Sequence, residues 1–347
     1  MILKRLLLFA FVLPCLGLSA QNKKAEQKYE EFTELVKSRR FESGAELLKK
    51  IIGMKMPVYQ KVDYTLRLGV LYKDSLLNYT EAMKYFEQAH ALEPKLAKEK
   101  NVPFDEYTNA IATHLMISEM SDTLKEYKRM QEANECGLRF YESVIAPKIP
   151  SDYSDYDLAL MHAMLYANLG NAFGKQGKYD EGAASFERSL QIFQNAIDSP
   201  SGEPILYTMK WSYRIMYSLM YSKMKGDKQK AYEIVMQNLP EFQAAINMKD
   251  EDLKATLEMQ GPMFIFNFAD AAYEVENYEQ CVQFCTDALT WPNRMYDPII
   301  IDKQGQAFLK LGREEEAREC WTKVKAIIPD YFDDNIPVNP LRDKFGR

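Results

Sequence analysis

The chain has 347 residues, a formal net charge of −6, and only 15 glycines and 15 prolines. That length allows one or two compact domains or one solenoid, and so little glycine and proline argues against disorder or a turn-rich β-sandwich. The acidic balance also argues against a nucleic acid partner, because phosphate binding needs clustered basic residues and no run here exceeds Lys23-Lys24 or Ser38-Arg39-Arg40.

Residues 1–20 are predicted to be a signal peptide. Two basic residues at 4–5 precede an unbroken apolar run at 6–13, and the small residues of 17–20 offer a cleavage site before Gln21. The run is too short to span a bilayer, and no second apolar run follows it. We therefore expect an exported chain that does not span the membrane after cleavage.

Two other fates of this leader stay open. The segment 13–15 superficially resembles a lipobox, but Pro14 stands where a small residue is required before Cys15. The leader could also remain as an uncleaved anchor. It is similar to bacterial leaders, and its Ser-Ala-Gln junction to those of Gram-negative exported proteins, which implies the periplasm, the outer membrane surface or the medium.

Three segments farther along share a pattern of apolar and small residues at helical spacing. They are Tyr64, Leu68, Gly69, Tyr72, Ala82, Phe86, Ala89 and Pro94; Tyr166, Leu169, Gly170, Phe173, Gly182, Phe186 and Ser189; and Ile301, Gly305, Phe308, Gly312, Ala317, Trp321, Val324 and Pro329. In the first, residues four apart share one helix face, and Gly69 is small so that two helices can approach beside Phe86. Asn78 is a predicted cap, and Pro94 is expected to end the second helix.

Weaker copies of the pattern fill most of the remaining chain, at 29–51, 211–239 and 265–288. The stretch 104–146 departs most. It predicts one helix marked by Phe104 to Leu115 and a second from Leu124 to Ile145 that is longer than the repeat allows. No segment alternates as a strand would, so the chain is predicted to be all-α.

A repeat near 34 residues with small residues at fixed helix crossings resembles the tetratricopeptide repeat. The resemblance implies a right-handed superhelical solenoid of stacked helix-turn-helix hairpins, which presents a surface rather than a reaction centre. The predicted organisation is a signal peptide at 1–20, repeats at 21–146, further repeats at 151–329 and a tail at 330–347. The segment 147–155 is either a hinge or an ordinary loop, and the tail either extends or covers the last hairpin.

The residue types that perform chemistry form no recognisable motif. The cysteines that follow the leader are Cys136, Cys281, Cys285 and Cys320, and buried thiols are expected, with a Cys285–Cys320 disulfide as the alternative. The three histidines are far apart in sequence, and no nucleophile elbow, phosphate loop or dinucleotide fingerprint occurs. We predict no enzyme activity, no cofactor and no metal site.

In a solenoid of this kind, the first helix of each hairpin lines the concave face. The predicted binding residues on that face are Lys73, Asn171, Lys175, Lys223, Asp270, Tyr273, Gln306 and Lys310. Asn171 with Lys175 is similar to half of the family's carboxylate clamp. Ala167 stands where that clamp has a lysine, which argues against recognition of a carboxylate tail.

Two short motifs, Asp74-Ser75-Leu76 and Asp122-Thr123-Leu124, resemble a bacterial O-glycosylation acceptor. Ser75 and Thr123 are therefore candidate glycosylation sites, although Thr123 with Glu126 also fits a capping box.

Taken together, these features predict an exported, non-enzymatic scaffold of the bacterial cell envelope that binds a protein or peptide. One alternative is a glycan- or peptide-binding module related to outer-membrane nutrient-binding proteins. Another is a purely structural part of an envelope assembly.

Overall fold

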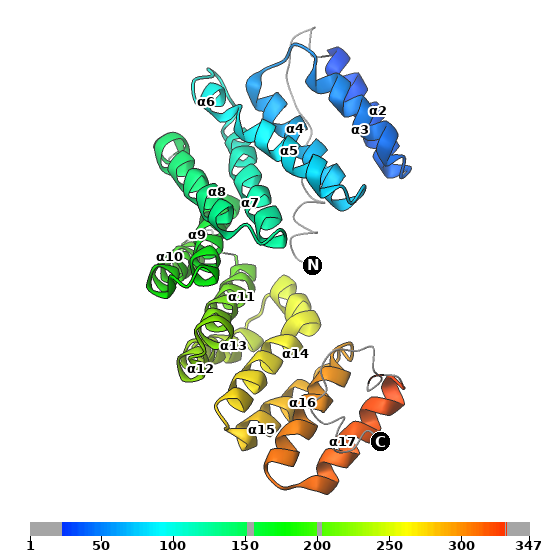
Figure 1. Ribbon diagram of the computed structural model, residues 1–347, viewed down its shortest axis with the longest axis vertical. Coiled ribbons are helices and arrows are strands. Elements are labelled where there is room, and N and C mark those ends of the chain that lie inside the picture. Colours follow the sequence, from blue (N-terminus) through cyan, green and yellow to red (C-terminus); the bar gives the residue numbers. More distant parts are fainter. Residues whose placement is uncertain (1–22, 151–155, 200–202, 330, 332–347) are drawn as a thin grey trace. The chain divides into compact units, whose positions relative to one another are not determined.

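A computed structural model describes residues 23–150, 156–199, 203–329 and 331. Its regular structure is helical throughout, and no strand occurs within those ranges (Figure 1). The chain divides into two compact units: residues 1–120 with 143–148, and residues 121–142 with 149–347. Each is a stack of helical hairpins, as the sequence predicted. No helix of the described ranges is both long and apolar enough to cross a membrane.

The first unit contains two helical hairpins, followed by a short helix and most of a further long helix. Its elements are α2 (Lys23–Lys37), α3 (Phe41–Ile52), α4 (Val58–Asp74), α5 (Tyr79–His90), α6 (Glu93–Leu96), η1 (Phe104–Tyr107) and most of α7 (Thr108–Thr123). At the crossing of α4 and α5, a Cβ on Gly69 would lie 2.4 Å from Phe86 Cε1. Only glycine permits that approach, which explains the small residue at this position.

Capping in this unit is partly as predicted. The Asn78 side chain accepts a hydrogen bond from the backbone N–H of Glu81 and caps α5. The prediction for Pro94 was wrong: α5 already ends at His90, and Pro94 lies in the first turn of the short helix α6. Proline suits that position because the first helical N–H groups have no intrahelical acceptor.

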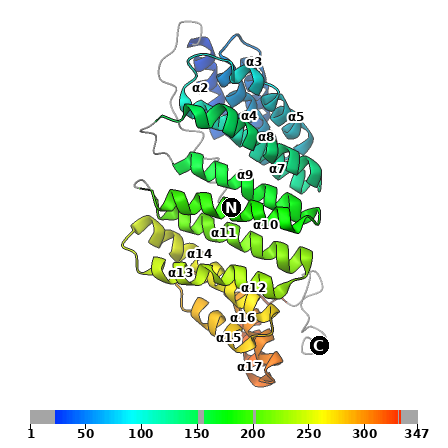
Figure 2. The ribbon, with the colours of Figure 1, turned by 90° about the vertical axis from the view of Figure 1, so that its left-hand side faces the viewer.

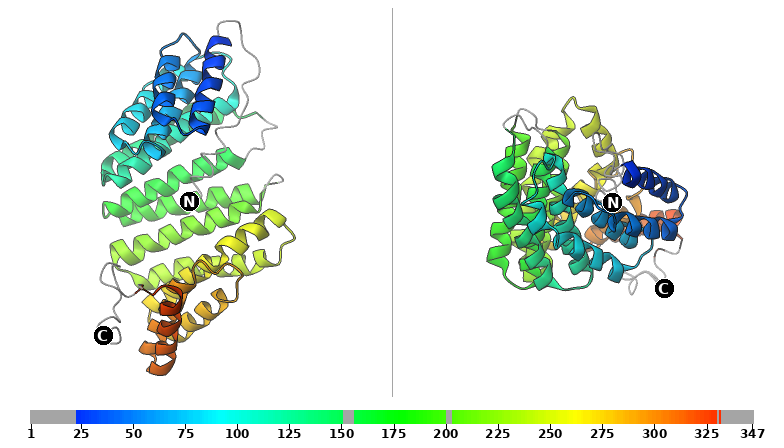
Figure 3. Two further views of the ribbon diagram at one scale, coloured as in Figure 1. Left: turned by 90° about the vertical axis from the view of Figure 1, so that its right-hand side faces the viewer. Right: turned by 90° about the horizontal axis from the view of Figure 1, so that it is seen from above.

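The second unit contains four hairpins and two additional helices. Its elements are α8 (Tyr127–Phe140), α9 (Tyr156–Lys175), α10 (Tyr179–Ile197), α11 (Ile205–Leu219), η4 (Met220–Lys225), α12 (Lys228–Met236), α13 (Asn238–Ile246), α14 (Glu251–Glu274), α15 (Tyr278–Ala288), α16 (Asp297–Lys310) and α17 (Glu314–Ile327). Successive hairpins pack against one another from α9 to α17 (Figures 2 and 3). A Cβ on Gly170 would meet the Gly182 carbonyl oxygen at 2.9 Å and Phe186 Cδ2 at 2.7 Å.

The stretch 104–146 folds differently from its prediction. Its second helix begins at Tyr127 rather than Leu124, and Leu124 is exposed. The helix continues as a π-helical turn η2 (Tyr141–Ile145) and a 3₁₀ turn η3 (Ala146–Lys148). Glu126 is the N-cap of α8, while Thr123 is the last residue of α7, so the capping box predicted from Thr123 is wrong.

Two features of the second unit had no counterpart in the sequence pattern. Helix α13 follows α12 directly, and α14 has 24 residues and retains Pro262 in its interior. The extra helix and the long one pack Phe242 and Phe264 around Trp211, which is fully buried. These side chains belong to an apolar cluster whose members extend from α11 to α16.

Several predictions fall partly or wholly outside the described residues. The signal peptide at 1–20 and most of the tail at 330–347 lie there, as do residues 151–155 of the predicted hinge. Within the tail, Tyr331 is described and packs on the last hairpin, where its hydroxyl lies 3.4 Å from Asp302 Oδ2.

Candidate interaction surface

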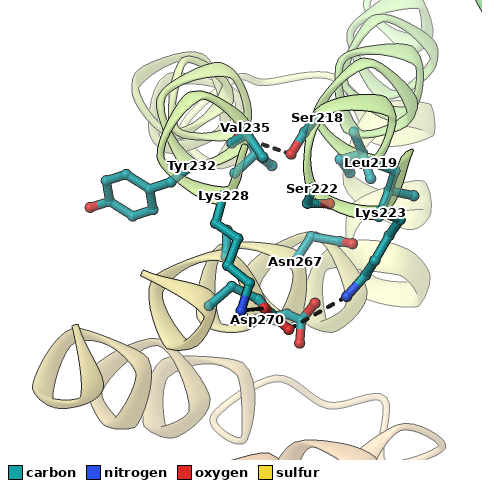
Figure 4. A pocket seen from close by; sticks show the side chains of 13 residues that line it. Ser218, Leu219, Ser222, Lys223, Lys228, Tyr232, Val235, Asn267 and Asp270 are labelled. Carbon is teal, nitrogen blue, oxygen red and sulfur yellow. Dashed lines mark hydrogen bonds and ion pairs between the residues drawn. The ribbon is translucent and has the colours of Figure 1, made fainter. Parts of the chain in front are cut away.

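The second unit contains a recess where α11, η4, α12 and α14 meet (Figure 4). The recess is small and open to solvent, with about 30 Å³ of room for water-sized groups. The lining residues are Ile215, Ser218, Leu219, Ser222, Lys223, Lys228, Ala231, Tyr232, Val235, Asn267, Asp270, Ala271 and Glu274. An apolar floor therefore carries polar and charged groups of both signs.

The local sequence places two lysines on opposite sides of this recess. The π-helical turn η4 ends at Gly226, whose φ of +79° is readily available to glycine. Asp227 then caps α12 by accepting a hydrogen bond from the backbone N–H of Lys230. As a result, Lys223 lies within η4 and Lys228 begins α12, and Figure 4 shows both side chains extending toward α14.

Both lysines converge on one carboxylate. Lys228 Nζ lies 2.8 Å and Lys223 Nζ 3.4 Å from Glu274 oxygens. Burial acts to raise the pKa of Glu274, but the hydrogen bond from Lys228 and the charges of both lysines outweigh it and lower that pKa. Glu274 is therefore ionised at neutral pH and holds the two lysines over the recess.

A second ion pair continues from the recess to the next hairpin. Lys303 Nζ on α16 lies 2.7 Å from Asp270 Oδ1 and 4.5 Å from the centre of the Tyr273 ring. Burial acts to lower the pKa of Lys303, yet the charge of Asp270 raises it overall. Similar ion pairs join successive first helices elsewhere: Lys73 with Glu119 at 2.9 Å in the first unit, and Lys175 with Asp122 in the second.

The eight predicted binding residues thus have different surroundings. Lys223 and Asp270 line the recess, and Tyr273 lies beside it under Lys303. Gln306 donates to Asp302 at 3.1 Å, and Lys310 is exposed at the end of α16.

The other three lie elsewhere. Asn171 and Lys175 are half-buried on α9, whereas Lys73 belongs to the first unit and is only 6% exposed. Their participation in binding stays a prediction.

The sequence pattern missed Ser222, Lys228 and Asn267 as lining residues. The π-helical turn η4 shifts the register of the helix by one residue, and the sequence shows no sign of it apart from Gly226. Met220, which begins η4, is fully buried against Gly174 and Gly182.

The remaining candidates are placed as follows. Ser75 is the partly buried C-cap of α4, and Thr123 is exposed; their glycosylation stays a prediction. Cys281, Cys285 and Cys320 are buried free thiols, so the alternative Cys285–Cys320 disulfide is not present. A hydrogen bond with Cys281 and burial raise the pKa of the Cys285 thiol.

No metal site was predicted from the sequence, but the fold brings together three potential ligands that are separated along the chain. His90, Glu93 and His114 lie side by side in the first unit, with their ligand atoms within 4.8 Å of one another. A 21-residue separation between Glu93 and His114 hides this cluster from any sequence motif.

A family model described as the tetratricopeptide repeat matches residues 163–195, which span most of the α9–α10 hairpin. This chain has the tetratricopeptide-repeat fold. The resemblance predicted from residue spacing is therefore confirmed, and the matched hairpin is one of the three that carry the pattern most clearly.

Solved structures agree with this fold. A tetratricopeptide repeat protein from Parabacteroides merdae is 13% identical, with 88% of this chain and 94% of that one covered at a TM-score of 0.50. The apo form of RapI is 12% identical, with 90% and 78% covered and a TM-score of 0.55. BtubC from P. vanneervenii is 11% identical, with 76% and 94% covered and a TM-score of 0.51. Identities this low show a shared fold alone. Comparison with the curated proteins found no match.

Proposed function

We propose that this tetratricopeptide-repeat chain is a non-enzymatic scaffold that binds a protein or peptide segment at the recess between α11, α12 and α14. The observation that carries the proposal is the recess itself, where polar groups from successive hairpins converge over an apolar floor. Repeat proteins of this kind use extended surfaces of stacked hairpins for binding.

The chemistry of the recess suits a peptide. Asn267 and Ser222 on its wall offer amide and hydroxyl groups, which can both donate to and accept from a peptide backbone. Lys223 and Lys228, each more than half exposed, supply mobile cations at the rim for acidic side chains. Ile215 and the exposed Leu219 supply the apolar area that excludes water from those contacts.

Site-specific photo-crosslinking in the native cells tests this surface. A benzoylphenylalanine replaces Lys223 at the rim or, as a matched control, exposed Gln283 on the second helix α15. We expect a discrete protein adduct from position 223 and none from position 283. An adduct from position 283 alone would refute binding of the partner at the recess. A bound glycan with no protein adduct would favour the ligand-binding alternative.

We further propose that the scaffold acts outside the cytoplasm, in the periplasm or at the outer surface of a Gram-negative bacterium. The support is the leader at 1–20, with its basic start, short apolar run and small-residue cleavage site. Mass spectrometry of the protein from fractionated cells tests it. We expect a mature N-terminus at Gln21 in the envelope or medium, whereas an intact leader on cytoplasmic protein would refute export.

A further inference from the structure

Three potential metal ligands from separate helices meet inside the first unit. His90 is the last residue of α5, Glu93 the first of α6, and His114 lies within α7. The His114 Nε2 lies 3.0 Å from Glu93 Oε1, and the His90 Nδ1 lies 3.1 Å from Glu93 Oε2. The His114 Nε2 also lies 3.1 Å from Glu93 Oε2, so both imidazole nitrogens converge on one carboxylate.

The burial of this cluster is unusual for its chemistry. His114 is fully buried and Glu93 is 5% exposed, whereas the His90 side chain is 43% exposed. Burying a carboxylate is costly unless cations or donors compensate it. The cluster therefore has a closed interior end at His114 and an open end at His90.

Three buried atoms of the cluster lack a hydrogen-bond partner within the described part of the chain: His90 Nδ1, Glu93 Oε1 and His114 Nδ1. Without an ion, the His114 Nε2–H donates to the Glu93 carboxylate, 3.1 Å away. Because no partner holds the His114 Nδ1, the proton can move to Nδ1 when an ion takes the Nε2 lone pair. An imidazole in that tautomer, aimed at a carboxylate, is a ready metal ligand.

The distances are compatible with a bound ion. Tetrahedral zinc with bonds near 2.05 Å places its ligand atoms about 3.3 Å apart. The two nitrogen–oxygen separations are 3.0 and 3.1 Å, and all ligand atoms lie within 4.8 Å. Side-chain adjustments of about an ångström would accommodate the ion, and the half-exposed His90 is free to make them.

We propose that His90, Glu93 and His114 form a binding site for a divalent first-row transition metal ion, with Zn²⁺ as the reference ligand. Imidazole nitrogen with carboxylate oxygen suits zinc and its neighbours, whereas Mg²⁺ and Ca²⁺ prefer sites made of oxygen alone. Three protein ligands leave a fourth position, which lies toward the open end and is filled by water. The bound ion joins α5, α6 and α7.

Isothermal titration of the full chain with Zn²⁺, in a thiol-free reductant, tests the site. We expect one equivalent to bind, and His90→Ala and Glu93→Gln to weaken that binding by at least about tenfold. The matched control is His162→Ala, which removes the remaining histidine, in the second unit, and leaves the affinity unchanged. Because His90 is half-exposed, its variant keeps the fold, and a melting curve without metal verifies this.

The buried cysteines are a competing site, and Co²⁺ distinguishes them. Coordination by nitrogen and oxygen gives weak visible bands, whereas thiolate ligands add intense near-ultraviolet charge-transfer absorption. We expect the weak bands alone, lost in His90→Ala. Thiolate absorption, or Zn²⁺ affinity that survives both His90→Ala and Glu93→Gln, would overturn the proposal, as would the absence of any binding.

Discussion

Two glutamates of the second unit each face two cations, but one pair of cations is buried and the other pair is exposed. Glu241 on α13 accepts from Lys210 at 2.8 Å and from Trp211 Nε1 at 3.0 Å, with Arg214 at 3.5 Å. Glu274 at the recess faces Lys223 and Lys228 at similar distances. The side chains of Lys210 and Arg214 are 4% and 9% exposed, whereas those of Lys223 and Lys228 are 57% and 55% exposed.

The difference lies in what each arrangement can do. Buried cations cannot regain water, so the Glu241 cluster is committed to holding α13 against α11. Burial lowers the pKa of Arg214 even though Glu241 opposes that shift. Exposed lysines lose little when they change partner, so the Glu274 pair can exchange its internal contacts for a bound peptide. Burial, more than residue type, separates structure from binding here.

The largest effect is expected from Glu241→Gln. The substitution leaves Lys210 and Arg214 buried without a counter-charge, and the unfolding free energy should fall by about 3 kcal/mol. Urea denaturation of the variant measures this. Glu274→Gln is the matched control, and an equal loss in both variants would erase the distinction between the two clusters.

The second largest loss of stability is expected at the crossing of α9 and α10. Gly170→Leu forces a side chain against the Gly182 carbonyl and Phe186, and overpacking of this kind costs about 2 kcal/mol. Gly44→Ala is the control, because a Cβ there meets Phe32 and Val36 at an ordinary 3.6 Å. Thermal melts compare the two variants. An unchanged melting temperature for Gly170→Leu would contradict the close approach of the two helices at Gly170.

His162 is partly buried without a counter-charge, so the free energy of unfolding should depend on pH. Burial and the charge of Arg188 lower the pKa of His162 to about 4, below its ordinary value of 6.5. The unfolded chain therefore takes up a proton first as the pH falls, and stability decreases between about pH 6.5 and pH 4 by at most about 1.4 kcal/mol per pH unit. Denaturation of the wild type and His162→Gln across this range should show a slope that the variant loses. Parallel curves would mean that His162 titrates normally in the fold.

The smallest effect on stability is expected at the recess. Lys223→Ala should change the unfolding free energy by less than about 1 kcal/mol, because the ion pair with Glu274 is exposed. The same variant should weaken capture of the partner identified by crosslinking. Unchanged capture would show that Lys223 does not contribute to binding. A large loss of stability would show that Lys223 has a structural role, like the buried Lys210.

The sequence alone determined the hairpins, because their signals are local. Spacing of four residues, a glycine at each crossing and a cap such as Asn78 act within about 34 residues. These local signals were sufficient to predict the all-α class and the need for small residues at Gly69 and Gly170. They also placed Lys223 and Asp270 on one surface.

Only the tertiary structure decided which polar side chains meet. Glu241 reaches Lys210 through the unpredicted helix α13, and the π-helical turn η4 sets which lysines reach Glu274. His114 joins His90 and Glu93 only because α7 packs beside α5 and α6. Such contacts join residues that are 21 to 51 positions apart, and their distance in sequence leaves no periodic mark. Burial, which separates a structural ion pair from one open to a partner, is likewise a property of the packed hairpins.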